Sequence, residues 1–143
     1  ALGRATVRSG HRRLVEGSEH YFVAAYEHRL GRPADHGALL GLGTVAMASL
    51  QRTLDGAGSA DSVDGARSAD SVERAIDLLG RCGVASNPNQ LGLDEGTFRG
   101  LLRHTVRFAI GEALPYSVLN EADVNWSASE EMWRQVWRVP AVR

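Results

Sequence analysis

Two histidines near the start of the chain are the side chains best suited to chemistry. His20 follows Glu19, and His36 lies sixteen residues further on, between Asp35 and Gly37. Neutral imidazole is a borderline-soft ligand that suits zinc, iron, nickel or cobalt. A catalytic metal site commonly takes three protein ligands and keeps one position open. The pair therefore predicts part of a metal site, although the spacing alone fits two unligated histidines equally well.

The neighbours of the two histidines have simpler structural explanations. Asp35 is a favourable N-cap residue, so its carboxylate would point at backbone N–H groups rather than at a metal. Glu19 lies in the first turn of an expected helix, where the helix dipole favours a negative charge. Gly37 has no side chain, so substrate or backbone could approach closely beside His36.

The elements that must position these residues are helices. Apolar residues recur at helical spacing, whereas the alternation typical of strands is hard to find. The sequence therefore predicts an all-α fold of about five helices, at residues 18–30, 35 to about 50, 71 to about 79, 94–111 and in the tail after Ser127. Ser18 is the expected N-cap of the first helix, and Ser127 with Glu130 forms the expected capping box of the last. A Gly-Arg-Pro turn at residues 31–33 would direct both imidazoles toward one point.

The helix expected from residue 35 is apolar around most of its circumference and should be the central, buried helix. Gly41 and Gly43 lie in its interior, where each costs about 1 kcal/mol relative to alanine. We therefore expect close packing or a pocket wall at these two positions. The pentapeptide SADSV then occurs twice, at 59–63 and 68–72, in a stretch rich in small and polar residues that indicates a surface loop.

The composition limits the classes of function. The chain has 143 residues, enough for one domain, and its sixteen basic and seventeen acidic side chains nearly cancel. No basic stripe indicates nucleic-acid binding, and no polybasic run indicates a membrane surface. The single cysteine, Cys82, fits a reducing compartment, and no apolar run is long enough for a membrane span or a signal peptide. We expect a soluble cytoplasmic domain that binds neither nucleic acid nor membrane.

Residues 17–50, GSEHYFVAAYEHRLGRPADHGALLGLGTVAMASL, resemble the glycerol-1-phosphate dehydrogenases. These belong to a superfamily with iron-dependent alcohol dehydrogenases and dehydroquinate synthase-like enzymes. Its members carry Gly-Ser-Glu-His on one helix, then His-Gly opening the next helix and a Gly-x-Gly-Thr-like run. The resemblance continues through residues 78–108 and 115–121 and covers most of residues 9–121, which leaves a Trp-rich tail at 122–143.

The resemblance implies the C-terminal helical, metal-binding domain of such enzymes, formed here by residues 1–143 as a single domain. It implies that His20 and His36 bind a catalytic zinc or iron ion. In that reading Ser18 and Glu19 orient the first histidine or line the substrate pocket, and Gly37 also lines this pocket.

The sequence departs from the family pattern in several places. Family members carry an N-terminal nucleotide-binding domain and an upstream aspartate as the third metal ligand, and neither has a counterpart among these residues. Ala24 replaces the second histidine of a His-x-x-x-His motif, and Ala38 replaces a polar residue after His-Gly. Pro115 replaces an arginine that would suit a phosphate. The glycine run lies within an expected helix, so it is not a nucleotide fingerprint.

Three functions remain open at this point. The chain could be the metal-binding subunit of a split NAD(P)-dependent dehydrogenase-like enzyme, acting on a polyol or another alcohol or carbonyl substrate with a separate nucleotide-binding subunit. It could be a subunit of a sugar-phosphate cyclase or lyase, which the loss of arginine at Pro115 disfavours. It could also be a non-catalytic relic that binds a partner. We expect a hetero- or homo-oligomer. The tail has one apolar face, formed by Met132, Trp133, Val136 and Trp137. Such a face packs on the protein's own core more often than it forms an interface with a partner.

Overall fold

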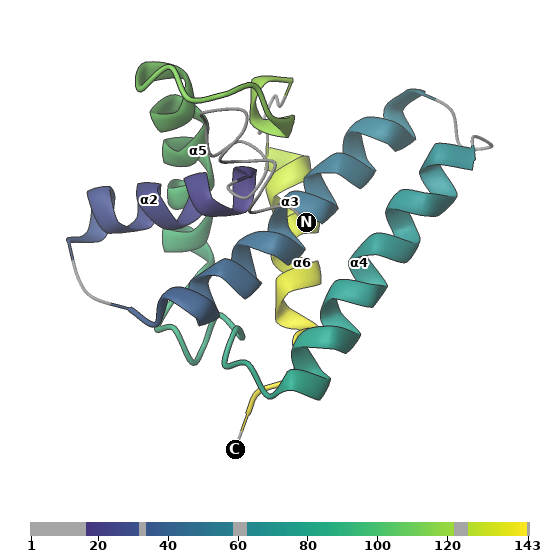
Figure 1. Cartoon of the computed structure of the whole chain (residues 1–143), viewed down its shortest axis with the longest axis horizontal. Helices are drawn as coiled ribbons and strands as arrows, with labels where there is room; N and C mark the ends of the chain where they lie inside the picture. The colour runs from purple at the N-terminus through teal and green to yellow at the C-terminus, as the bar shows by residue number, and fades with distance from the viewer. Residues whose placement is uncertain (1–16, 32–33, 59–62, 122–125, 143) are drawn as a thin grey trace, which may run out of the picture.

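The structure is a computed structural model that describes residues 17–31, 34–58, 63–121 and 126–142. Within these ranges it contains five α-helices, one short 3-10 helix and no strand, which confirms the predicted all-α fold. The elements shown in Figure 1 are α2 (Ser18–Leu30), α3 (His36–Gly58), α4 (Val63–Cys82), α5 (Glu95–Gly111), η2 (Val118–Asn120) and α6 (Trp126–Trp137).

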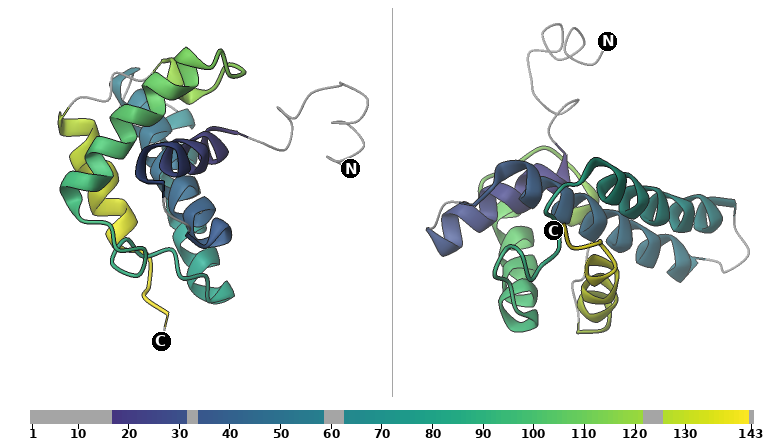
Figure 2. Two further views of the ribbon diagram at one scale, coloured as in Figure 1. Left: turned by 90° about the vertical axis from the view of Figure 1, so that its left-hand side faces the viewer. Right: turned by 90° about the horizontal axis from the view of Figure 1, so that it is seen from below.

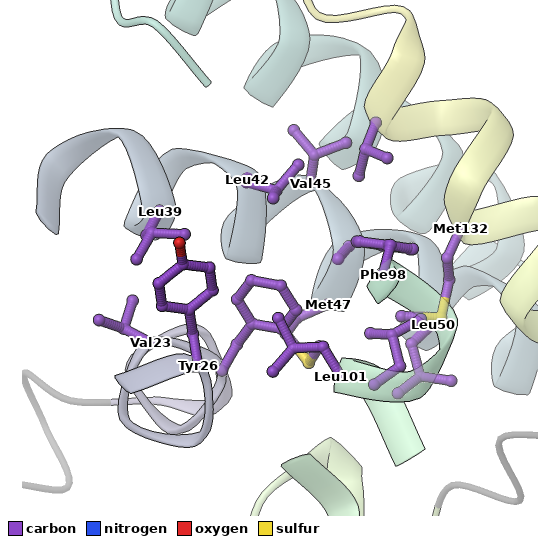
Figure 3. Close-up of a cluster of buried hydrophobic side chains, with 14 of the residues drawn as sticks. Val23, Tyr26, Leu39, Leu42, Val45, Met47, Leu50, Phe98, Leu101 and Met132 are labelled. Atoms are coloured by element: carbon purple, nitrogen blue, oxygen red, sulfur yellow. The ribbon is translucent and has the colours of Figure 1, made fainter. Parts of the chain in front are cut away.

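Helix α3 is the centre of the fold, as predicted. It packs against α2, α4 and α6, and it lies side by side with α4 in Figure 1 and in the right-hand view of Figure 2. Side chains from α2, α3, α5 and α6 meet in one core, shown in Figure 3. The largest fully buried residues include Tyr26, Phe22, Phe98, Leu39, Leu42, Leu50 and Met132. The apolar surface removed from water at this junction is the main force that holds the helices together.

Helix α2 has the predicted bounds but not the predicted cap. Gly17 occupies the N-cap position and no side chain caps the helix, so the assignment of this role to Ser18 was wrong. At the other end, Gly31 adopts a left-handed conformation (φ 58°), and its N–H donates to the carbonyl oxygen of Glu27 at 3.1 Å. Glycine adopts this conformation without steric cost, so it ends the helix cleanly.

Two helices are longer than the sequence pattern predicted. Helix α3 continues from Leu50 to Gly58, and α4 begins at Val63 rather than at Ser71. The prediction of a loop is therefore wrong for the second SADSV copy, which lies inside α4. Residues 59–62 of the first copy are outside the described ranges. The apolar positions Val72 and Ile76 of α4 are buried in the core, because α4 packs along α3. Pairing with α3 thus extends a helix whose first part lacks a strong local signal.

The last two helices show one confirmed and one incorrect cap. Asp94 caps α5, and its Oδ1 accepts a hydrogen bond from the Thr97 N–H at 2.7 Å. Helix α6 already begins at Trp126, so Ser127 and Glu130 lie within it and the predicted capping box is wrong.

The tail packs on the core, as the sequence favoured. Met132 and Val136 are fully buried, whereas Trp137 is 44% exposed. Arg138 forms a two-pronged ion pair with Glu73 of α4, with distances of 2.6 and 2.7 Å. These contacts hold α6 against α3 and α4. None of the helices in the described ranges combines the length and apolarity that a membrane span requires.

Candidate metal centre

His20 and His36 lie together in one pocket between α2 and α3. His20 is in the first turn of α2 and His36 is the first residue of α3, and their ring centroids are 6.1 Å apart at an angle of 55°. Metal–nitrogen bonds of about 2.0–2.1 Å would place the centroids of two imidazoles on one tetrahedral ion about 5 Å apart. The observed centroid separation is thus about 1 Å larger than the separation on a shared ion.

A carboxylate fixes the tautomer of His20. Nδ1 of His20 lies 3.1 Å from Oε1 of Glu19, and the same oxygen accepts a hydrogen bond from the Gly17 N–H at 3.1 Å. An ionised carboxylate only accepts hydrogen bonds, so Nδ1 carries a proton, and in the neutral ring the free lone pair is then on Nε2. Metal-binding histidines are typically held in this way by a carboxylate or carbonyl on the other ring nitrogen.

Two glycines of α3 allow close packing, as predicted, and Gly43 lies against the turn that carries His20. A β-carbon at Gly43 would lie 3.0 Å from the Glu19 carbonyl oxygen and 3.3 Å from the Phe22 ring. A β-carbon at Gly41 would collide with Ser86 Oγ and lie 2.8 Å from Leu79. Both glycines therefore sit where neighbouring segments contact the α3 backbone, which offsets their cost in a helix interior.

The other predicted pocket residues lie around this site rather than within it. Ser18 and Glu19 line a neighbouring hollow of about 430 Å³ together with Tyr116 and Ser117. Gly37 is exposed in the first turn of α3 and lines neither hollow.

Asp35 plays the predicted capping role at α3. Its Oδ1 accepts a hydrogen bond from the Ala38 N–H at 2.8 Å. Its carboxylate is therefore occupied with backbone, as the sequence indicated.

The pocket contains two carboxylates that the sequence reasoning missed. It has a volume of about 360 Å³, and Glu27, Glu112 and Ala24 line it beside both histidines. Glu27 follows His20 by two helical turns, so the i, i+7 spacing was an available signal. Glu112 follows the end of α5, and only the tertiary fold brings it here.

The described residues contain no group of three or more histidines, cysteines or acidic residues close enough to hold an ion. His20 and His36 are two imidazoles that line one pocket, which is fewer than the three protein ligands that a catalytic zinc site commonly uses.

Comparison with known proteins shows that the chain is similar in sequence to an enzyme of known activity. The chain is 33% identical over 109 residues, or 75% of its length, to glycerol-1-phosphate dehydrogenase from Thermococcus kodakarensis, which is named as acting with NAD(P)+. The aligned part amounts to 26% of that enzyme, so the chain spans about a quarter of its relative. This similarity supports a relation to the glycerol-1-phosphate dehydrogenases. No family model matches the chain, and no solved structure matches it.

Proposed function

We propose that the chain is the metal-binding helical part of an NAD(P)-dependent dehydrogenase-related enzyme that acts on a polyol or another alcohol or carbonyl substrate. A separate nucleotide-binding subunit completes the site. The observation that carries the proposal is the meeting of His20 and His36 in one pocket, with Glu19 holding the proton of His20 at Nδ1. The similarity to a dehydrogenase over most of the chain points to the reaction class.

In this proposal His20 and His36 hold a zinc or iron ion. When bound, such an ion polarises a substrate carbonyl or alkoxide oxygen as a Lewis acid. Glu27 and Glu112 line the same pocket, and their carboxylates would accept hydrogen bonds from the hydroxyl groups of a polyol. Phe108 and Leu114 supply apolar wall that keeps part of the pocket away from water.

The nicotinamide cofactor is assigned to the partner subunit. A dinucleotide fingerprint requires a strand, a glycine-rich turn and a helix in succession. The described residues form helices only, and Gly37, Gly41 and Gly43 all lie within α3. The partner would also contribute the remaining metal ligand. The subunit arrangement is therefore part of the proposal, and mixing the chain with a nucleotide-binding candidate would test it.

The first experiment measures metal content by mass spectrometry on untagged protein, as purified and after reconstitution with zinc or iron. The test variant is His20→Ala with His36→Ala. The matched control is His28→Ala with His104→Ala, which also removes two imidazoles from α2 and its neighbours. We expect near-stoichiometric metal in the wild type and the control, and its loss in the test variant. Equal metal in all three proteins, or none in the wild type reconstituted together with a nucleotide-binding partner, would contradict the proposal.

A further inference from the structure

Among the arginines whose side chains the structure describes, three lack the carboxylate partner that the others have. All sixteen basic residues are arginines, and the structure describes the side chains of nine of them. Six form ion pairs with aspartate or glutamate, namely Arg52, Arg74, Arg81, Arg99, Arg134 and Arg138. Among the described residues, no carboxylate pairs with Arg29, Arg103 or Arg107.

These three arginines gather where α2 meets α5. Gly100, Arg103 and Arg107 share one face of α5, because residues three, four and seven apart are neighbours on a helix. Arg29 of α2 reaches this face, and its Nη2 lies 3.3 Å from the position that a β-carbon would take at Gly100. Its guanidinium group therefore rests against α5 at a point where any side chain would obstruct it. The cationic cluster is defined here as Arg29, Arg103 and Arg107 with His28 and His104.

The two histidines of the cationic cluster form a direct hydrogen bond between α2 and α5. Nδ1 of His28 lies 3.1 Å from Nε2 of His104. The ring planes differ by 12° and the centroids are 5.3 Å apart, so the close approach of the nitrogens requires the rings to meet edge to edge. One nitrogen donates a proton and the other must accept with a free lone pair, so at least one ring is neutral.

Positive charge surrounds this histidine pair. Burial lowers the pKa of His104, and the positive charges of His28, Arg29 and Arg107 lower it further. The other charged residues next to the pair on the two helices are Arg103 on α5 and Glu27 on α2, and Glu27 lines the His20 pocket. Phe108 packs against both rings of the pair and also lines that pocket, so it lies between the two sites.

We propose that the cationic cluster binds a multivalent oxyanion of the phosphate class, at a site separate from the His20–His36 pocket. Guanidinium groups present planar pairs of N–H donors that match phosphate oxygens. Like charges gathered on one surface repel each other, and a bound anion removes this repulsion. Bound phosphate also favours protonated imidazole, so binding strengthens as the pH falls through the pKa of His104. This inference does not depend on the proposed dehydrogenase function.

The test is a titration with inorganic phosphate, at constant ionic strength set with sodium chloride, followed through the histidine ring resonances by NMR. We expect saturable shifts of the His28 and His104 signals and a rise in the pKa of His104. The variant Arg29→Gln with Arg107→Gln should bind about tenfold more weakly or worse, because it removes charge-assisted hydrogen bonds. The control variant, Arg74→Gln with Arg81→Gln, removes two exposed arginines of α4 and should bind like the wild type.

Two results would overturn the inference. One is a response to phosphate that does not saturate or that chloride reproduces at equal ionic strength. The other is equal phosphate affinity in both double variants, with circular dichroism showing that each is folded. A phosphomonoester tested in parallel identifies the source of the anion. If the phosphomonoester binds more tightly than inorganic phosphate, the ligand is the phosphoryl group of an organic molecule. If the two bind equally, the ligand is the free ion. Either result supports the site.

Discussion

The carbonyl oxygen of Glu19 lies 3.0 Å from the position that a β-carbon would occupy at Gly43. The first turn of α2 therefore rests directly on the backbone of α3, with no side chain between them. This turn also carries His20, whose ring centroid is 6.1 Å from that of His36. The relative position of the two helix backbones that carry these imidazoles is thus set by a direct backbone contact.

Replacement of Gly43 by alanine should push α2 away from α3. Overpacking of this kind costs about 1–3 kcal/mol, and the better helix propensity of alanine offsets about 1 kcal/mol of that cost. We expect a lower free energy of unfolding in urea and weaker metal retention. Gly111→Ala is the control, because nothing lies within 4 Å of the added β-carbon. A Gly43→Ala protein as stable as the control would mean that the helices adjust without loss.

Removal of the Glu19 carboxylate should weaken metal binding without removing a ligand. Loss of a partner that orients a metal-binding histidine typically costs about 10–100-fold in affinity. We expect a loss of this size for Glu19→Ala and a smaller one for Glu19→Gln, whose amide oxygen still accepts from His20 Nδ1. Competition titration with a zinc chelator measures both. Glu130→Ala, in α6, controls for the loss of one negative charge. Equal zinc affinities for all the proteins would show that Glu19 does not contribute to metal binding.

A histidine at position 24 should strengthen metal binding. Ala24 lines the pocket beside His20 and His36, and it lies one helical turn from His20, where residues four apart are neighbours. Ala24→His would supply a third imidazole toward the same space. We expect zinc affinity to rise by about tenfold or more, since a third ligand completes the minimum protein set of a catalytic site. Gln51→His, exposed on α3, should leave the affinity unchanged, and a rise in both variants would indicate nonspecific binding.

The cap of α5 should make stability depend on pH on the acid side. The backbone hydrogen bond from Thr97 holds the pKa of Asp94 below its usual value of 3.8. A carboxyl group whose folded pKa is lowered stabilises the fold above its unfolded pKa, and this contribution disappears as the pH falls through the folded pKa. Asp94→Asn keeps a cap acceptor but does not titrate. Urea unfolding between about pH 2 and 6 should show a smaller acid-side loss for this variant, and parallel curves would exclude Asp94 as a contributor.

The sequence was informative about helices whose ends carry local signals. Asp94 marks the start of α5, and Gly31 marks the end of α2 in the left-handed conformation that glycine favours. The far end of α3 and the first part of α4 carry no such signal, because their glycine-, serine- and aspartate-rich sequence resembles a loop. Their helical state follows from the pairing of α3 with α4, which only the tertiary structure reveals.

The sequence also predicted only part of the candidate site. The proximity of His20 and His36 was expected from the turn at residues 31–33 and from the family resemblance, whereas their spacing alone is equally compatible with two unligated histidines. Glu112 joins their pocket across more than seventy residues of sequence. The contact between His28 and His104 spans 76 positions. No periodicity within one helix predicts contacts of this kind, because they depend on how α2 and α5 cross.

All three tryptophans of the chain belong to α6. Trp133 packs against Phe98 of α5 at 5.3 Å between ring centroids and meets Trp137 edge-on at 5.4 Å. Indole absorbs and emits at longer wavelengths than any other side chain, so the intrinsic fluorescence of the protein comes from its last helix. An emission shift therefore reports that α6 has left or joined the core. The protein thus carries its own optical reporter for the docking of α6, and no dye has to be attached.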